Sequence, residues 1–98
     1  MTSDDIRVDA SRRELLIKRG DKWLRREGMT VRELQLLERL VHRRGTVVDR
    51  AELIEAVWGD RESVRPGVVD KHVAALRKKL GALGRRIHSV YGVGYKLA

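Results

Sequence analysis

The fold of this chain is decided by residues 66–80, which read PGVVDKHVAALRKKL. Apolar side chains recur along this stretch at steps of four, three and four residues, at Val69, Val73, Leu76 and Leu80. This spacing keeps them within about 60° of one another around an α-helix. Pro66 suits the first helical position, where a backbone N–H would have no partner within the helix. We therefore predict a helix over 66–80 that buries this stripe.

The opposite face of the predicted helix carries lysines with small side chains between them. Projection around the apolar stripe turns outward Gly67, Lys71, Ala74, Ala75 and Lys78. These residues are flanked by Asp70, His72, Arg77 and Lys79. Small side chains let a helix approach the floor of the DNA major groove, where alanine methyls can touch thymine methyls. A solvated amphipathic helix has the same pattern, so both interpretations stay open at this point.

Two shorter helices with clear start signals precede it. Thr30 and Glu33 fit a capping box, in which each side chain accepts a hydrogen bond from the backbone N–H of the other residue. Asp49 fits the cap of a second helix, and a glycine follows each of the two apolar stretches. We predict helices at about 30–44 and 50–58.

Residues 5–28 and 87–97 predict β-structure on either side of the helices. Three or four short antiparallel strands are expected in the first region, because short apolar centres alternate with turn-like residues. The continuous apolar run at 15–17 predicts a strand covered on both faces, and Trp23 is expected to pack on the sheet. The glycines around Tyr91 predict a hairpin. The whole chain is expected to form one α+β domain over 1–98.

The positive charge of the chain is concentrated in its last 38 residues. The net charge is +8; residues 1–60 hold 13 Lys and Arg against 12 Asp and Glu, whereas residues 61–98 hold 9 against 2. An evenly charged soluble protein would spread this excess along the chain. The segregation indicates a surface that meets a polyanion.

Catalytic chemistry is not expected from this sequence. It has no cysteine, which excludes disulfides and cysteine-based zinc sites. His42, His72 and His88 lie among basic residues without carboxylates at ligand spacing, so we expect neither a metal nor a cofactor. No arrangement suggests a nucleophile and its base, and no apolar run approaches the roughly 18 residues of a membrane span. We expect a cytoplasmic protein that is not an enzyme.

The order of the predicted elements is that of a helix-turn-helix followed by a β-hairpin wing. Stretches along the whole chain resemble the OmpR/PhoB-type effector domains of bacterial two-component response regulators. They are TVRELQLL at 30–37, GTVVDRAEL at 45–53, EAVWG at 55–59, VDKHVAALRKKL at 69–80 and VYGVGYKL at 90–97. The resemblance implies a winged helix whose third helix reads double-stranded DNA in the major groove.

The same resemblance assigns roles to individual residues. Lys71, Ala74, Ala75 and Lys78 are expected to face bases or nearby phosphates, and His72 and Arg77 the phosphate backbone. Tyr91 at the wing tip is expected beside the minor groove, and the indole N–H of Trp58 on the backbone. Trp58 fits a core position equally well, and its amphipathic ring allows both. The expected DNA-binding residues are Trp58, Val68, Lys71, His72, Ala74, Ala75, Arg77, Lys78, Lys79, Arg85, Arg86 and Tyr91.

The chain departs from the family pattern where arginines are common. Ala74, Ala75 and Tyr91 stand at positions that often hold Arg, and Gly67-Val68 replaces a frequent Arg-Thr pair. A bidentate contact from Arg to guanine discriminates between bases by about 1–3 kcal/mol. We therefore expect DNA binding of modest intrinsic affinity or with an unusual site preference.

The resemblance also implies partners. The loop at 59–65 resembles the segment with which such regulators contact RNA polymerase, and two copies are expected on direct-repeat half-sites. The alternative function is a winged-helix module that binds a protein through the same surface. Salt dependence separates the two, because phosphate binding weakens steeply with salt.

Overall fold

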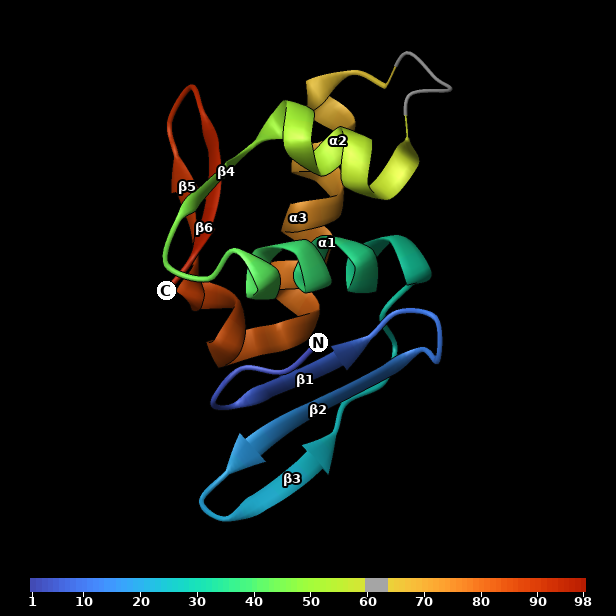
Figure 1. Ribbon diagram of the computed structural model, residues 1–98, viewed down its shortest axis with the longest axis vertical. Coiled ribbons are helices and arrows are strands. Elements are labelled where there is room, and N and C mark those ends of the chain that lie inside the picture. The colour runs from blue at the N-terminus through green and yellow to red at the C-terminus, as the bar shows by residue number, and fades with distance from the viewer. Residues whose placement is uncertain (60–63) are drawn as a thin grey trace.

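Three helices pack against one another, with an N-terminal antiparallel sheet below them and a second small antiparallel sheet at their side, in the computed structural model, which describes residues 1–59 and 64–98 (Figure 1). The helices are α1 (Val31–His42), α2 (Arg50–Trp58) and α3 (Pro66–Leu80). The N-terminal sheet consists of β1 (Ile6–Asp9), β2 (Glu14–Arg19) and β3 (Lys22–Arg25), in that order. The C-terminal sheet has the order β4-β6-β5, from β4 (Val47–Asp49), β5 (Ile87–Val90) and β6 (Gly94–Leu97).

The start of α1 forms the capping box that the sequence predicts. The backbone N–H of Glu33 donates to the Thr30 hydroxyl at 3.1 Å, and the Thr30 N–H donates to the Glu33 carboxylate at 2.8 Å. Glu33 is buried, and the ammonium of Lys79 also donates to it at 2.8 Å. A cap that stabilises one helix therefore also connects it to the last turn of α3.

The core lies where α1, α3 and the N-terminal sheet meet. The predicted stripe of α3 is buried along its whole length, with each of its four side chains at most 1% exposed. The same core contains five buried apolar side chains of α1, namely Leu34, Leu36, Leu37, Leu40 and Val41. Each such side chain stabilises the fold by about 1.5–3 kcal/mol when it leaves water. This burial determines which face of α3 points outward.

The prediction that the strand at 15–17 is covered on both faces is wrong. Leu15 and Ile17 are buried, whereas Leu16 between them is only half-buried. Leu16 lies on the outer face, opposite Arg7 on one side and Arg25 on the other. Trp23 is half-buried on this same sheet, with the Arg7 guanidinium 4.1 Å from its ring centre. A long basic side chain, rather than a second layer, partly covers the outer face.

The short strand β4 joins the hairpin in a way that the sequence does not reveal. Val47, Val48 and Asp49 pair with Lys96, Tyr95 and Gly94 of β6. Asp49 is also the N-cap of α2, where its carboxylate accepts from the Glu52 N–H at 2.8 Å. The hairpin of β5 and β6, hereafter the wing, is therefore attached directly to the start of α2.

The end of α3 leads into a 3₁₀ helix, η1 (Gly81–Arg86), which the sequence analysis does not predict. Gly81, with φ of 63°, ends α3, and η1 turns the chain back toward β5. At Gly84 a Cβ atom would lie 2.3 Å from the carbonyl oxygen of Arg77. Only a glycine therefore allows this close return.

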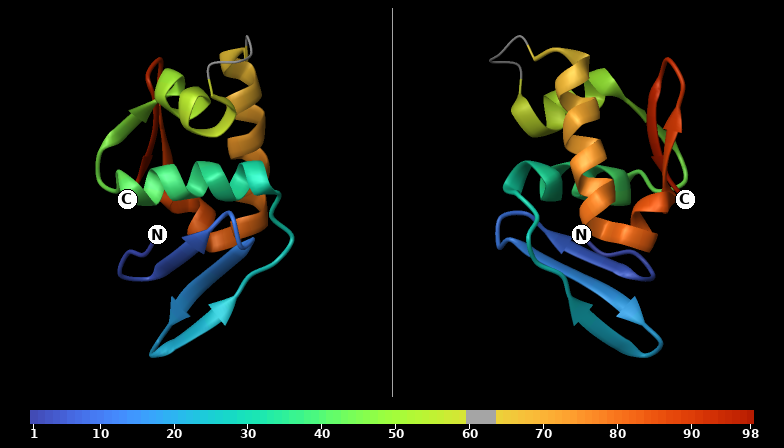
Figure 2. Two further views of the ribbon diagram at one scale, coloured as in Figure 1. Left: turned by 45° about the vertical axis from the view of Figure 1, so that its right-hand side comes forward. Right: turned by 180° about the vertical axis from the view of Figure 1, so that it is seen from behind.

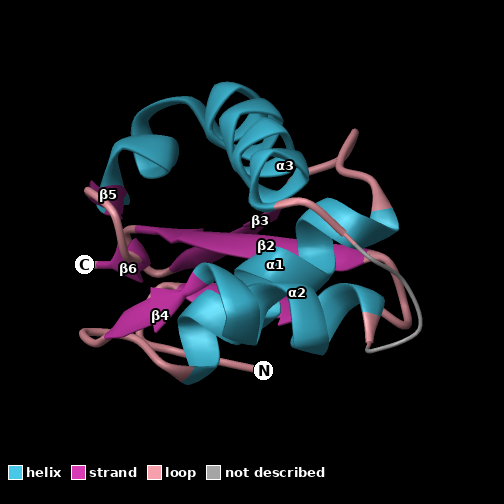
Figure 3. Cartoon of the chain, turned by 90° about the horizontal axis from the view of Figure 1, so that it is seen from above, coloured by secondary structure: helices cyan, strands magenta, loops and turns pink. Residues whose placement is uncertain are grey.

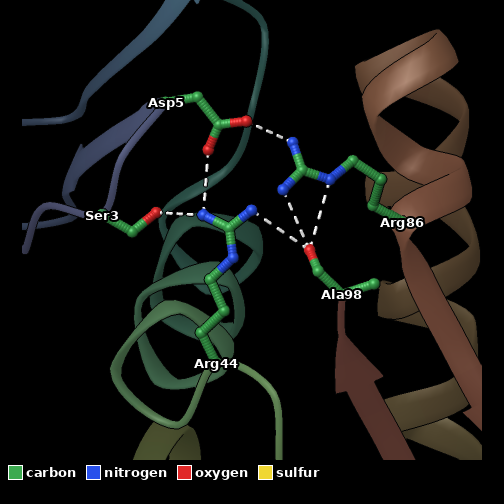
Figure 4. A network of polar contacts seen from close by, with 5 residues as sticks. All are labelled: Ser3, Asp5, Arg44, Arg86 and Ala98. Atoms are coloured by element: carbon green, nitrogen blue, oxygen red, sulfur yellow. Dashed lines mark hydrogen bonds and ion pairs between the residues drawn. The ribbon is translucent and has the colours of Figure 1, made fainter.

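A polar network holds the two ends of the chain together (Figure 4). The Asp5 carboxylate accepts from Arg44 at 2.9 Å and also from Arg86. Both arginines donate to the carbonyl oxygen of Ala98. The network joins the residue before β1, the end of α1 and the base of the wing. Within the described part of the chain, no helix has the length and apolar character that crossing a membrane requires.

We expect the free energy of unfolding to fall as the pH drops below 4.5, the ordinary pKa of Glu33. Burial, the largest effect, raises this pKa, but hydrogen bonds from Lys79 and Thr30 together outweigh it and hold the pKa below that value. A lowered folded-state pKa stabilises the fold above the unfolded value, and this contribution is lost as the pH falls through the folded one. Urea unfolding from pH 7 to pH 3 measures the effect.

The variant Glu33→Gln should show a weaker pH dependence than the wild type, because it has no carboxyl group to protonate at this position. The matched control is Glu55→Gln, which changes an exposed glutamate of α2. The same pH dependence in Glu33→Gln and Glu55→Gln would contradict the assignment.

Candidate nucleic-acid interface

The outward side of α3 and the wing form one face of the molecule. In the view from behind, α3 runs along the front with the wing beside it (Figure 2, right). Helix α1 lies behind α3, and the N-terminal sheet lies at the bottom. A view from above looks nearly along α3 and places it at the side of the molecule opposite α2 (Figure 3). A helix and a hairpin side by side can enter neighbouring grooves of a duplex.

The most exposed row of α3, hereafter the groove face, consists of Gly67, Lys71, Ala74 and Lys78. Val68 and Ala75 lie beside this row and are half-buried. Neither lysine forms an ion pair with any residue in 1–59 or 64–98. Seven residues separate them, which corresponds to about 10 Å along the helix. The groove face therefore presents two positive charges that form no ion pair with the described residues, and the methyl group of Ala74 lies between them.

Trp58 at the end of α2 lies against His72 of α3. Their rings meet edge to face, with centroids 5.2 Å apart. The Nδ1 atom of His72 lies 2.8 Å from the carbonyl oxygen of Val68, so this nitrogen donates and the other ring nitrogen is left for a ligand. Trp58 packs against the core and remains half-buried. The ring is thus partly in the core, and its contact with a phosphate stays a prediction.

Arg77 points to the wing rather than away from the protein. Its guanidinium donates to the carbonyl oxygen of Ile87 through Nε at 2.9 Å and through a terminal nitrogen at 2.6 Å. The same terminal nitrogen donates to the Ser89 hydroxyl at 2.8 Å. The guanidinium also lies 5.2 Å from the ring centre of Tyr95. The phosphate contact expected for Arg77 therefore competes with three hydrogen bonds inside the protein.

Two other predicted DNA-binding residues are similarly engaged. Lys79 donates to the buried Glu33 carboxylate, and Arg86 pairs with Asp5 at the opposite end of the wing from its tip. Arg85, by contrast, is exposed. Basic residues that are close together in the chain thus differ in role: Lys79 and Arg86 form ion pairs within the protein, whereas Arg85 is exposed to solvent.

The tip of the wing is open to solvent. Gly92 takes φ of 73° at the turn, and the Val93 N–H donates to the Val90 carbonyl oxygen at 3.0 Å. Tyr91 is fully exposed, at 100%, and Val93 is 47% exposed. An exposed aromatic ring at the tip of a narrow hairpin is suited to contact a second molecule. Tyr91 thus lies at the wing tip as expected, and its place beside the minor groove stays a prediction.

Sequence reasoning missed the polar cluster that surrounds Asp70. Arg50 donates to the Asp70 carboxylate at 2.9 Å, and the Tyr95 hydroxyl donates to the same oxygen. The Tyr95 hydrogen bond, the largest cause, lowers the pKa of Asp70; burial opposes it, and Arg50 lowers it further. Burial and the Asp70 hydrogen bond raise the pKa of Tyr95. The sequence feature that could have indicated this cluster is Asp70, the only carboxylate in the basic stretch 66–80.

Arg65 is a second residue that the sequence analysis did not single out. It is exposed and occupies the N-cap position of α3. Part of the predicted RNA polymerase loop at 59–65 lies outside the described residues, namely 60–63. No group of three or more His, Asp or Glu side chains that could hold a metal occurs among the described residues.

A three-helix domain with a reading helix and a hairpin on one face is a winged helix-turn-helix domain. Residues 25–97 match the family described as transcriptional regulatory protein, C terminal. The chain therefore belongs to this family, the OmpR/PhoB type of C-terminal domain. The family resemblance and the fold class expected from the sequence are confirmed.

Curated relatives are response regulators of greater length. MprA of Mycobacterium leprae is 35% identical over 99 residues, which cover 99% of this chain and 41% of that protein. PrrA of Mycobacterium tuberculosis is 42% identical over 71 residues, which cover 70% of this chain and 30% of that protein. The chain thus spans at most 41% of the length of these two relatives.

Solved structures show the same fold over nearly the whole chain. The DNA-binding domain of the response regulator AdeR, solved in complex with an intercistronic region, has a TM-score of 0.80 and 26% identity, covering 98% of this chain and 96% of that one. The DNA-binding domain of CpxR from E. coli has a TM-score of 0.75 and 27% identity, with 99% and 93% covered.

We expect Gly94→Ala to destabilise the protein by about 1–3 kcal/mol, because overpacking at a rigid contact costs this much. A Cβ atom at Gly94 would lie 2.0 Å from the carbonyl oxygen of Val48, on the strand that holds the wing to α2. The matched control is Gly67→Ala, where the Cβ would meet nothing within 4 Å. It should raise stability by up to about 1 kcal/mol, as alanine favours a helix. Thermal unfolding measures both changes, and equal melting temperatures would contradict the steric argument.

Proposed function

We propose that this chain binds double-stranded DNA sequence-specifically and regulates transcription. In this proposal α3 enters the major groove and the wing lies along the adjacent minor groove. The observation that carries it is the groove face, whose two lysines have no described ion-pair partner, on a helix that lies beside the wing (Figure 2). The structure of the related AdeR domain in complex with an intercistronic region supports DNA binding by a domain of this fold.

The contacts divide into two kinds. Lys71 and Lys78 neutralise phosphates or donate to guanine, while the indole N–H of Trp58 donates to the DNA backbone and His72 lies beside it at the flank of the groove. Tyr91 extends toward the minor groove from the wing tip. Phosphate neutralisation supplies much of the affinity and is independent of sequence. Specificity must therefore come from the few side chains that reach base edges.

Further partners follow from the same proposal. Two copies would bind direct-repeat half-sites, and the loop at 59–65 would contact RNA polymerase. Because the relatives are more than twice as long, the chain's role in a whole regulator belongs to this proposal. A domain with this function would act at the bacterial nucleoid, in the cytoplasm.

The double variant Lys71→Ala/Lys78→Ala should bind duplex DNA more weakly than the wild type. Removing two phosphate contacts should lower the slope of log affinity against log salt by about two units, since each contact contributes about 0.9. Fluorescence anisotropy with a mixed pool of duplexes at several salt concentrations measures the slope. Sequencing of the bound fraction then identifies the preferred site.

The matched control is Lys18→Ala/Lys22→Ala, which removes the same charge from exposed lysines of the N-terminal sheet. It should keep most of the affinity, because β2 and β3 lie at the opposite end of the molecule from the wing tip (Figure 1). Equal losses in the two double variants would place the DNA elsewhere. No binding by the wild type even at low salt would refute the proposed function and favour a protein partner.

We expect base readout at the middle of the groove face to rest on thymine methyl groups. Between the two lysines the row offers only the methyl of Ala74, and the forked donor of Arg77 is turned to the wing. Replacing one thymine of the preferred site by deoxyuridine should weaken binding about threefold to fourfold, the worth of one buried methyl-sized group. Competition binding with a set of singly substituted duplexes measures this loss.

The variant Ala74→Gly should remove the difference between thymine and deoxyuridine at that position only. Wild-type protein that binds every substituted duplex equally well would exclude methyl readout while leaving DNA binding itself intact.

A further inference from the structure

The wing touches α3 through polar side chains at two separate points. Near the start of α3, Asp70 accepts a hydrogen bond from Tyr95 of β6. Seven residues later, Arg77 donates to the Ile87 carbonyl oxygen and the Ser89 hydroxyl of β5. A spacing of seven keeps both residues on one flank of the helix, about 10 Å apart along its axis. Each strand of the wing thus has its own attachment to the same flank.

Tyr95 connects the two attachments. Its ring is buried, at 4% exposure, and the Arg50 guanidinium lies 5.7 Å and that of Arg77 5.2 Å from its centre. Arg50 also donates to Asp70, so the start of α2, the wing and α3 meet in one cluster. We call Arg50, Asp70, Arg77 and Tyr95 together the latch.

Two attachments can fix the orientation of the wing relative to α3, whereas a single attachment cannot. A two-stranded hairpin is only marginally stable by itself, and the strand pairing of β6 with β4 holds one edge of the wing. With a single further contact the wing could still pivot about that edge. Contacts at Asp70 and Arg77 hold both strands and so determine the angle between the wing and α3.

From this geometry we propose that Asp70 and Arg77 are positioning residues, which set the angle of the wing so that α3 and Tyr91 reach adjacent grooves together. The inference rests on the proposed function. DNA affinity then depends on the latch although neither residue contacts DNA, because an interface that is ordered before binding loses less entropy on binding. Arg77 differs in this from Lys71 and Lys78, whose ammonium groups have no described ion-pair partner.

The first experiment measures amide hydrogen exchange in the protein without DNA. In Tyr95→Phe and Arg77→Met, exchange in β5 and β6 should accelerate about tenfold relative to α1, because hydrogen bonds to charged groups are lost at one attachment. The control Arg25→Gln removes the ion pairs with Glu14 and Glu27 at the N-terminal sheet, away from the wing. It should leave the ratio of wing to α1 exchange unchanged. An unchanged ratio in the latch variants would overturn the proposal, whether or not the protein binds DNA.

The second experiment is a double-mutant cycle with Tyr91→Ala, measured by DNA binding. Tyr95→Phe removes no charge, yet it should weaken binding about threefold to tenfold, and Tyr91→Ala should then cost little more. Additive losses would overturn the inference, as would full affinity in Tyr95→Phe. Failure of the wild type to bind DNA is a separate outcome, which refutes the proposed function instead.

The variant Arg77→Lys separates positioning from a direct phosphate contact. A lysine keeps the charge but cannot reproduce the forked hydrogen bonds to Ile87 and Ser89. If Arg77 positions the wing, Arg77→Lys should bind DNA as weakly as Arg77→Met. If Arg77 binds a phosphate, Arg77→Lys should retain most of the affinity, and the inference would be wrong.

Discussion

The structure depends on the burial of one stripe of α3. Val69, Val73, Leu76 and Leu80 are almost completely removed from water, and they hold α3 against α1. Because a helix has a fixed 3.6-residue period, burying one stripe also determines which residues point outward. Gly67, Lys71, Ala74 and Lys78 are exposed for this reason alone. The groove face is thus a consequence of the core.

The flanks of α3 connect this core to the rest of the interface. On one side Asp70 and Arg77 hold the wing, and at the C-terminal end Lys79 reaches the buried Glu33 that also caps α1. Polar groups in these positions are satisfied by several partners each, which is the condition for burying them without a large cost. The same helix therefore has a buried stripe, a latched flank and an exposed row, each with its own chemistry.

The basic residues in the last part of the chain do not all have the same role. Of the twelve residues expected to bind DNA, Arg77, Lys79 and Arg86 are engaged by groups within the protein. Lys71, Lys78 and Arg85 are exposed. The groove face has no arginine, so under the proposed function base recognition would rest on shape and methyl contacts more than on forked hydrogen bonds. A net charge establishes attraction to a polyanion, but not which cations produce it.

The amino-acid sequence by itself determined the three helices, the capping box of α1, the hairpin and the outward row of α3. These features depend on local periodicity and on residues close together in the chain. Only the tertiary structure decided that β4 pairs with the wing, that Leu16 is only half-buried and that Arg77 donates hydrogen bonds to the wing. Arg50, Asp70 and Tyr95 meet across separations of 20 and 25 residues. Such partners are set by the packing of α2, α3 and the wing, and no pattern of neighbouring residues contains that information.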